Sequence, residues 1–399
     1  MRKLLLLLLL ATSITTRAQD SLGKRMEVYG FVMVDGGFNF DQMNPQWFDV
    51  ARPTQLPSYK NEYGTNGNIF FSVRQTRLGF NFYDVAPKSE IHGRFEFDLF
   101  GVGANVGETT FHLRQAYIEY KRWTVGQTWS PFINPDVAPI TLDFWGPTGM
   151  VFYRNIQLRY SAIRNQHHLL NLALERPGAT ADEGIYQGYI GLQNVKPLFR
   201  YPDFSVEYRR MYSKGFLEVA GILREIGWRD IADDGYDLNG DALARGATIS
   251  SVYQVTKNNT FKAQILYGCG IESCMNDAPA DIGVREIGDS LSNRPLEGYA
   301  LPTFGYFLAL EHSWNNKLSS SFAYSNVIIK NSATSLPGTF REGSYAMANL
   351  LYYPTEHLMC GVEFQYAYRQ NQAVLNDFIE SSMRKIQVSI RYDFGQTWK

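Results

Sequence analysis

The sequence has almost no net charge and no long hydrophobic segment beyond its first residues. In its 399 residues, 38 Lys and Arg stand against 39 Asp and Glu, which argues against a basic nucleic-acid-binding protein. After the N-terminus, no apolar run approaches the roughly 20 residues that a membrane-spanning helix needs. A polytopic helical membrane protein is therefore excluded.

The motifs of common catalytic and metal centres are also missing. The six histidines form neither a His-Glu-x-x-His pair nor a cluster with cysteine, and the Gly-x-Ser-x-Gly and phosphate-binding glycine motifs are absent. We therefore expect no catalytic residues and no cofactor. One calcium candidate remains, although its order departs from the EF-hand: a loop that offers oxygen atoms from Asp233, Asp237, Asn239 and Asp241.

Cysteine is scarce, with three residues in the whole chain. Cys269 and Cys274 flank the start of a long loop and are candidates for a disulfide, which leaves Cys360 alone on a strand. This usage fits a protein exported to an oxidising compartment.

Glycine and aromatic residues, in contrast, are frequent. The chain has 34 Gly, 25 Tyr and 26 Phe, a composition that suits strands and turns better than helices. Apolar and polar side chains alternate in many segments, among them 362–368 and 386–394. The second of these resembles the C-terminal assembly strand of outer-membrane barrels, although the edge strand of a soluble β-sandwich alternates in the same way.

The N-terminus has the layout of a secretory signal peptide. A basic start at Arg2-Lys3 is followed by the apolar run Leu4–Leu10 and by small residues up to Ala18. We predict a signal peptide over residues 1–18, a short periplasmic segment over 19–26 and a β-barrel over 27–399.

Short turns and long loops alternate along the chain. Seven short turns are expected near residues 84–88, 121–122, 163–166, 213–215, 257–259, 315–316 and 354–355. Eight long loops lie between them, at about 39–67, 101–108, 129–150, 177–197, 227–241, 270–300, 331–342 and 370–382. The pattern predicts an all-β fold, a transmembrane antiparallel up-and-down β-barrel of about 16 strands with short periplasmic turns and long extracellular loops.

Two arginines break the alternation of their strands. Arg74 falls on the opposite parity from Arg77, and Arg114 shares its parity with Ala116 and Ile118. A β-bulge that shifts the phase, or a face buried at a subunit contact, would explain each of them.

Several segments resemble the DcaP-like outer-membrane porins. These segments are Arg74–Phe80, Gly93–Phe100, Leu113–Tyr117, Val125–Phe132, Thr141–Phe144 and Arg154–Tyr160. The resemblance covers roughly residues 26–399 and implies a homotrimer of 16-stranded barrels in the bacterial outer membrane that takes up small anionic solutes such as dicarboxylates. Some members carry a long periplasmic coiled coil, for which residues 19–26 are too few, so any trimer would be held by the barrels themselves.

A channel needs a constriction and an electric field rather than a catalytic centre. Loop 129–150, with Asp136, Asp143 and Trp145, resembles the third loop that narrows porin lumens; its other interpretation is a surface loop. Arginine suits a pore wall because it stays charged and offers forked donors to carboxylates. The residues predicted to line the pore are Arg77, Arg94, Glu96, Asp98, Glu119, Arg159, Arg209, Glu363, Arg369 and Arg391.

The predicted acids are expected to face the arginines across the lumen, where they would orient dipolar solutes. In the alternative interpretation, the charges neutralise each other and stiffen the wall.

Together these features predict an outer-membrane porin, a passive diffusion channel for small hydrophilic and anionic solutes that is not an enzyme. Its expected partners are outer-membrane lipids, two further copies of itself and small anions, and not nucleic acid. Two other classes stay open: a surface receptor or adhesin that uses the long loops, and a barrel-embedded hydrolase with Ser and His paired on its outer wall.

Overall fold

The structure is a computed structural model that describes residues 23–86, 89–287, 293–372 and 380–398. The predicted signal peptide, 1–18, lies outside the described residues. The first strand begins at Lys24, so the end of the predicted periplasmic segment 19–26 belongs to the barrel. Among the described residues, no helix is both long enough and apolar enough to cross a membrane.

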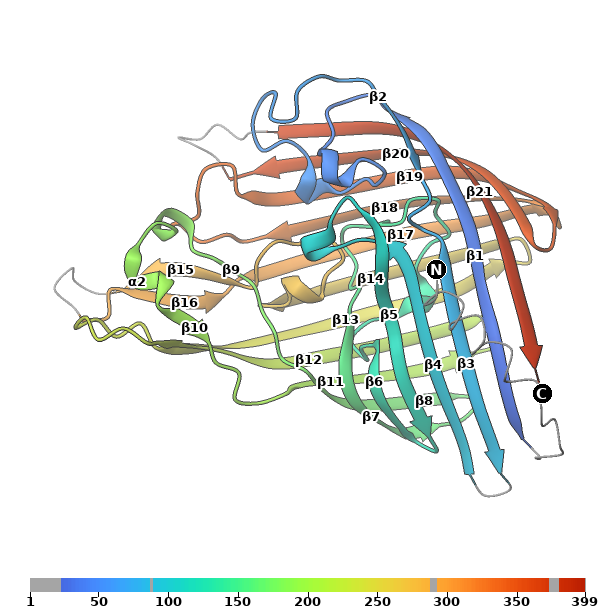
Figure 1. Cartoon of the computed structure of the whole chain (residues 1–399), viewed down its shortest axis with the longest axis horizontal. Coiled ribbons are helices and arrows are strands. Elements are labelled where there is room, and N and C mark those ends of the chain that lie inside the picture. The colour runs from blue at the N-terminus through green and yellow to red at the C-terminus, as the bar shows by residue number, and fades with distance from the viewer. Residues whose placement is uncertain (1–22, 87–88, 288–292, 373–379, 399) are drawn as a thin grey trace, which may run out of the picture.

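An antiparallel sheet closes on itself to form a 16-stranded barrel (Figure 1). The barrel strands are β1 (Lys24–Asn39), β3 (Arg77–Ala86), β4 (Ser89–Phe100), β5 (Thr109–Tyr120), β6 (Trp123–Trp129), β7 (Arg154–Arg164), β8 (His168–Glu175), β11 (Asp203–Tyr212), β12 (Gly215–Asp230), β13 (Gly240–Thr256), β14 (Asn259–Cys269), β17 (Pro302–Asn315), β18 (Leu318–Ile329), β19 (Phe340–Thr355), β20 (Leu358–Asn371) and β21 (Glu380–Trp398). Successive strands pair, and β1 pairs with β21 from Met26↔Trp398 to Asn39↔Lys385 to complete the ring. The predicted fold class is confirmed.

Shorter elements lie at the end of the barrel that carries the long loops. β2 (Asn68–Ser72) pairs with β1 beyond β3, and β10 (Val195–Pro197) pairs with β12 beyond β11. β9 (Ala181–Asp182), β15 (Ile282–Glu286) and β16 (Leu296–Ala300) form a small separate sheet, close to the helix α2 (Ile190–Gln193) in Figure 1. The stretches predicted as plain loops at 177–197 and 270–300 therefore contain strands.

Six single-turn 3₁₀ helices lie in the described loops. They are η1 (Pro45–Trp47), η2 (Pro53–Gln55), η3 (Gly103–Asn105), η4 (Pro135–Val137), η5 (Gly184–Tyr186) and η6 (Glu272–Cys274).

The two faces of each strand decide between a membrane barrel and a soluble sandwich. On β21, Val388 and Ile390 are 54% and 52% exposed, whereas Gln387 and Ser389, which alternate with them, are fully buried. Apolar residues therefore face out and polar residues face in, the reverse of a soluble fold. An exposed apolar wall around a polar interior is the arrangement that a bilayer requires.

Both irregular arginines are explained by an extra residue in the strand. β4 pairs with β5 as Glu96↔Gln115 and then Phe97↔Leu113, so Arg114 is a bulged residue without a partner in the ladder. Between the pairs Asp35↔Ser72 and Phe31↔Arg77, β1 has three residues. The segment opposite, which joins β2 to β3, has four, among them Arg74. Each bulge gives the lumen an additional side chain while the outward residues stay apolar.

The hydrophobic core lies inside the barrel, beneath the long loops. One buried cluster joins Phe132 and Ile133 of the β6–β7 loop with Ile271 and Met275 of the β14–β15 loop and with Leu266 of the wall. A second joins Ala51 and Leu56 of the first loop with alanines and methionines of β17–β21. Three loops therefore fold into the lumen and pack there as a core.

Candidate functional site

The loop between β6 and β7, residues 130–153 and here called the inner loop, runs around the inside of the barrel. Hydrogen bonds and ion pairs tie its residues 134–148 to the wall from β11 round to β21. The wall residues are Arg209, Ser250, Lys262, Glu311, Ser325, Asn349, Glu363, Lys385 and Gln387. Among the described residues, none of these polar contacts reaches β3–β7.

The acid Glu363 on β20 anchors the middle of the inner loop. Its carboxylate accepts hydrogen bonds from Thr141 Oγ1 and Leu142 N, both at 2.7 Å, and from Asp143 N at 3.2 Å. Glu363 itself is fully buried. Glu363 was predicted to line the pore, but the loop covers it. Its carboxylate therefore holds the loop against the wall.

Asp143 is also buried, beside a buried lysine. It is 2% exposed, its carboxylate accepts from Ala51 N at 3.2 Å, and Lys385 Nζ lies 3.8 Å away. Burial raises the pKa of Asp143 to about 6, and the positive charge of Lys385 opposes that rise. Asp143 therefore joins the inner loop to the first loop and to β21.

The other two residues predicted for the constriction differ in exposure. The side chain of Asp136 is 57% exposed and forms an ion pair with Arg209 at 2.6 Å. Trp145 donates from Nε1 to Asn276 O at 2.8 Å and packs under the guanidinium of Arg52, which lies 3.9 Å from the ring centroid. Asp136 is accessible to a solute, whereas Trp145 connects the inner loop with the first loop and the β14–β15 loop.

A buried charge cluster lies on β4 and β5. Arg114 donates from Nε to Glu96 Oε1 at 3.1 Å and from a terminal nitrogen to Asp98 Oδ2 at 2.6 Å. His112 Nδ1 lies 3.0 Å from Asp98 Oδ1, and Tyr29 OH donates to Glu96 Oε2 at 2.8 Å. Glu96 and Asp98 thus pair with neighbours on their own wall, and the expectation that they face the arginines from across the lumen was wrong.

Two arginines next to this cluster have no acid partner. Arg77 and Arg154 are half-buried, and among the described residues neither guanidinium has a carboxylate within 4.0 Å. One nitrogen of each is buried without a hydrogen bond. Arg77 lies 5.3 Å from the ring of Phe31, and Arg154 lies 5.1 Å from that of Trp129. Glu96 and Asp98 attract both side chains from further away, but these two acids serve three arginines, Arg77, Arg114 and Arg154, so this part of the wall has more positive than negative charge.

A cavity of about 490 Å³ opens beside Arg77. Arg94 and Arg391 line it together with Tyr29 and Phe31. Arg94 donates from Nε to Tyr29 OH at 2.6 Å, and Arg391 forms an ion pair with Asp393 on its own strand at 2.5 Å. Three of the predicted pore arginines therefore share one cavity.

The remaining predicted arginines are held by other groups. Arg209 contacts Glu218 and Asp136, both at 2.6 Å. Arg369 donates hydrogen bonds to Asn371 and to carbonyl oxygens of two loops, including Thr54 O and Leu56 O at 2.8 Å. These residues fasten loops to the wall.

Arg159 and Glu119 form a weaker pair. A terminal nitrogen of Arg159 lies 4.0 Å from Glu119 Oε1, and the Nε of Arg159 has no hydrogen bond. His92 Nδ1 contacts the other oxygen of Glu119 at 3.0 Å. With side chains 17% and 30% exposed, Arg159 and Glu119 stay accessible from the lumen.

The cysteine and calcium candidates are not supported. Cys269 and Cys274 are both free thiols, because η6 carries Cys274 into the core while Cys269 stays in the ladder opposite Arg245. Asp237 Oδ1 accepts hydrogen bonds from Asn239, which closes a local turn, and Asp241 is the second residue of β13. In the described part of the chain, no three acidic, His or Cys side chains gather in a group that could hold a metal ion.

Some wall residues escaped the sequence analysis. Lys385 lies on the same face of β21 as Gln387 and Ser389, so its parity marks it as inward. Tyr29 shares its parity with Asp35 on β1 in the same way. Arg114 was not predicted to line the pore because its parity was irregular, and the bulge that turns it inward leaves no mark in the sequence.

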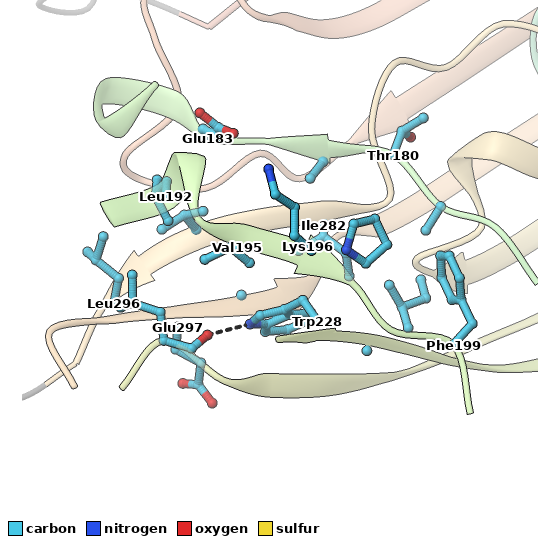
Figure 2. A pocket seen from close by; sticks show the side chains of 18 residues that line it. Thr180, Glu183, Leu192, Val195, Lys196, Phe199, Trp228, Ile282, Leu296 and Glu297 are labelled. Carbon is cyan, nitrogen blue, oxygen red and sulfur yellow. Dashed lines mark hydrogen bonds between the residues drawn. The ribbon is translucent and has the colours of Figure 1, made fainter. Parts of the chain in front are cut away.

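A separate cavity of about 180 Å³ lies among the long loops (Figure 2). Its lining includes Phe199, Trp228, Ile282 and Leu296, with Lys196 on β10. Trp228 Nε1 already donates to Leu238 O at 2.9 Å. This largely apolar lining does not suit a hydrated ion.

Comparisons with known proteins agree with this architecture. The outer-membrane channel DcaP of Acinetobacter baumannii is similar in structure, with a TM-score of 0.74, 18% identity, and coverage of 94% of this chain and 99% of that one. An anion-selective porin from Comamonas acidovorans has a TM-score of 0.56 and 11% identity over 93% of this chain and its whole length of 100%. OmpT of Vibrio cholerae has a TM-score of 0.55 and 10% identity over 94% and 99%. No curated protein matches the sequence.

The family comparison is more direct than these likenesses of fold. The model of the DcaP outer membrane protein family matches residues 2–394, nearly the whole sequence. With its closed barrel, its polar lumen and its inner loop, the chain belongs to the DcaP outer membrane protein family, whose members are channels of the bacterial outer membrane.

Proposed function

We propose that this channel is a passive pore that favours small anionic solutes, with no catalytic activity. The observation that carries the proposal is the pair of arginines without acid partners, Arg77 and Arg154. Guanidinium groups that form no ion pair within the protein attract carboxylates and offer them two parallel donors.

The inner loop concentrates this effect. The polar attachments of its residues 134–148 run from β11 to β21, and on the wall of β3–β7 the loop instead stacks Phe144 on Phe100 of β4, with 3.9 Å between the ring centroids. A solute that passes between the inner loop and this wall meets Arg77, Arg94, Arg154 and Arg159. Asp136 on the loop forms an ion pair with Arg209 at 2.6 Å, which weakens its negative field, although Arg209 also pairs with Glu218. The field along the path is therefore more positive on the side of the β3–β7 wall than on the side of the loop.

We further propose that the pore works as a homotrimer, as the resemblance to the porin family implies. The chain's apolar outer wall supplies a surface on which barrels can pack in the membrane.

Single-channel recording across a planar bilayer tests the proposal. Purified protein is added under a KCl gradient, and the reversal potential and the size of the conductance steps are measured. A reversal potential on the chloride side, and closures in three equal steps, support an anion-favouring trimer. A potassium-side reversal potential contradicts the anion preference, and the absence of conductance contradicts the pore itself.

A further inference from the structure

A groove of about 520 Å³ lies on the outside of the barrel, away from the lumen. Its floor is apolar and is built by Val125 of β6, Ile156 and Leu158 of β7, and Leu174 of β8. These four side chains are 44–53% exposed and belong to the outward faces of their strands. The floor therefore lies against the hydrocarbon of the bilayer.

Two arginines stand at one end of this groove. Arg176 directly follows β8, and Arg200 directly precedes the Tyr201-Pro202 segment that enters β11. Both are exposed, and in the part of the chain that the structure describes neither has a carboxylate within 4.0 Å. The nearest acid in sequence, Glu175, is 1% exposed and accepts from Ser130 inside the barrel. The end of the groove thus carries two uncompensated positive charges.

The topology fixes the leaflet in which these charges lie. β8 starts after the short turn at 165–167 and ends where the long loop begins, so Arg176 and Arg200 lie at the extracellular end of the wall. Tyr201, 60% exposed, stands at the same level, where an amphipathic ring suits the boundary between headgroups and hydrocarbon. The apolar floor lies below them, towards the middle of the membrane.

We propose that this groove binds a phosphorylated, multiply acylated glycolipid of the outer leaflet, a molecule of the lipid A type. The two guanidinium groups would hold its phosphates through paired charge-assisted hydrogen bonds, and its acyl chains would lie along Ile156, Leu158 and Leu174. Charge favours this occupant over a second copy of the chain. A second copy would have to bring carboxylates to both arginines, whereas a phosphorylated lipid carries the matching charge already.

Titration of lipid-free protein tests the proposal. The protein is refolded in detergent from material that never met a membrane, and diphosphoryl lipid A is added while bound lipid is counted by native mass spectrometry. We expect one lipid to bind wild type, and the R176Q/R200Q double variant to bind it at least roughly tenfold more weakly. The matched control is R122Q/R164Q, which removes two exposed arginines at short turns and leaves binding unchanged.

Two further measurements separate the lipid from its alternatives. Dephosphorylated lipid A keeps the acyl chains, and we expect it to bind wild type as weakly as intact lipid A binds the double variant. Equal binding of both lipids, or of wild type and R176Q/R200Q, overturns the proposal. Intermolecular disulfides formed by Y201C and not by wild type would show that a second copy occupies the groove, and would also overturn it. Heat-dependent gel mobility confirms that each variant is folded.

Discussion

Arg114 donates from Nε to Oε1 of Glu96 across 3.1 Å, from a bulged position of β5 that has no partner in the ladder with β4. The same guanidinium contacts Asp98, so a single bulged residue pairs with two acids that are 4% and 0% exposed. Replacing Arg114 by Leu would leave Glu96 with only the 3.4 Å contact of Arg94, and Asp98 with only His112. We expect a loss of about 3–5 kcal/mol of stability, measured as a lower midpoint of the heat-dependent gel shift. Arg122→Leu, at an exposed turn, is the control; an equal drop there would contradict the role of the bulge.

The unpaired arginines are expected to set the ion preference. Arg77→Gln and Arg154→Gln should each move the reversal potential under a KCl gradient towards zero, because each removes a positive charge that is not held in an ion pair within 4.0 Å by any described residue. Arg391→Gln is the matched comparison, since Asp393 at 2.5 Å already neutralises much of its charge. Equal shifts in all three variants would mean that local pairing does not matter.

The attachment of the inner loop depends on Glu363. Glu363→Gln keeps the size and shape of the side chain but replaces one accepting oxygen by an NH₂ group. This group can only donate, so it cannot accept the hydrogen bonds from Thr141, Leu142 or Asp143. We expect the loop to be held more weakly by about 1–3 kcal/mol, and the open-channel current to become noisier. Glu311→Gln touches only one loop nitrogen, Ile140 N at 2.9 Å, and should give a smaller increase. Quiet currents in both variants would argue that the other attachments suffice.

Asp143 gives the loop a pH dependence with a definite sign. Its pKa is raised to about 6, first of all by burial, so the folded protein keeps this proton at pH values where the unfolded chain releases it. The stability from this group is complete below about pH 4 and falls as the pH rises to about 6, by at most about 3 kcal/mol. The change from pH 4.5 to 7 in the thermal midpoint should therefore be smaller in Asp143→Asn than in wild type. Parallel curves for the two proteins would rule out Asp143 as the titrating group.

The thiols provide a chemical check on the core. Burial raises the pKa of the Cys274 thiol, which is 0% exposed in the cluster around Phe132. We expect Cys274 to resist maleimide until the barrel is unfolded, whereas the half-buried Cys360 reacts first. Intact mass before and after reduction should be the same. A difference of two hydrogens would restore the disulfide between Cys269 and Cys274.

The sequence was sufficient for the barrel because the period of two is imposed by the bilayer itself. Gln387 and Ser389 alternate with Val388 and Ile390 in the middle of β21, because lipid lies on one side of the strand and the polar lumen on the other. The strand ends were less well defined. β19 continues to Thr355 and so includes both residues of the predicted turn at 354–355, because its pairing with β20 extends to Thr355↔Leu358.

The role of each lumen residue could not be read from parity. Alternation marks Arg94, Arg209 and Arg369 equally as inward, yet only the path of the loops decides which of them contacts a carbonyl, an acid or the open lumen. Arg369 serves the carbonyls of Thr54 and Leu56, more than 300 positions away in the chain. Such contacts depend on how loops fill a closed space, and no local pattern records them.

The bulge at Arg114 also bears on how such pores diversify. In a regular strand, a residue can be added to the water-filled side only by displacing one on the lipid side, since the two faces alternate strictly. A single inserted residue escapes this limit, because it brings one more side chain into the lumen and leaves the lipid-facing sequence as it was. Insertions of one codon, and not only substitutions, are thus a route by which a barrel of fixed strand number can change its electrical character.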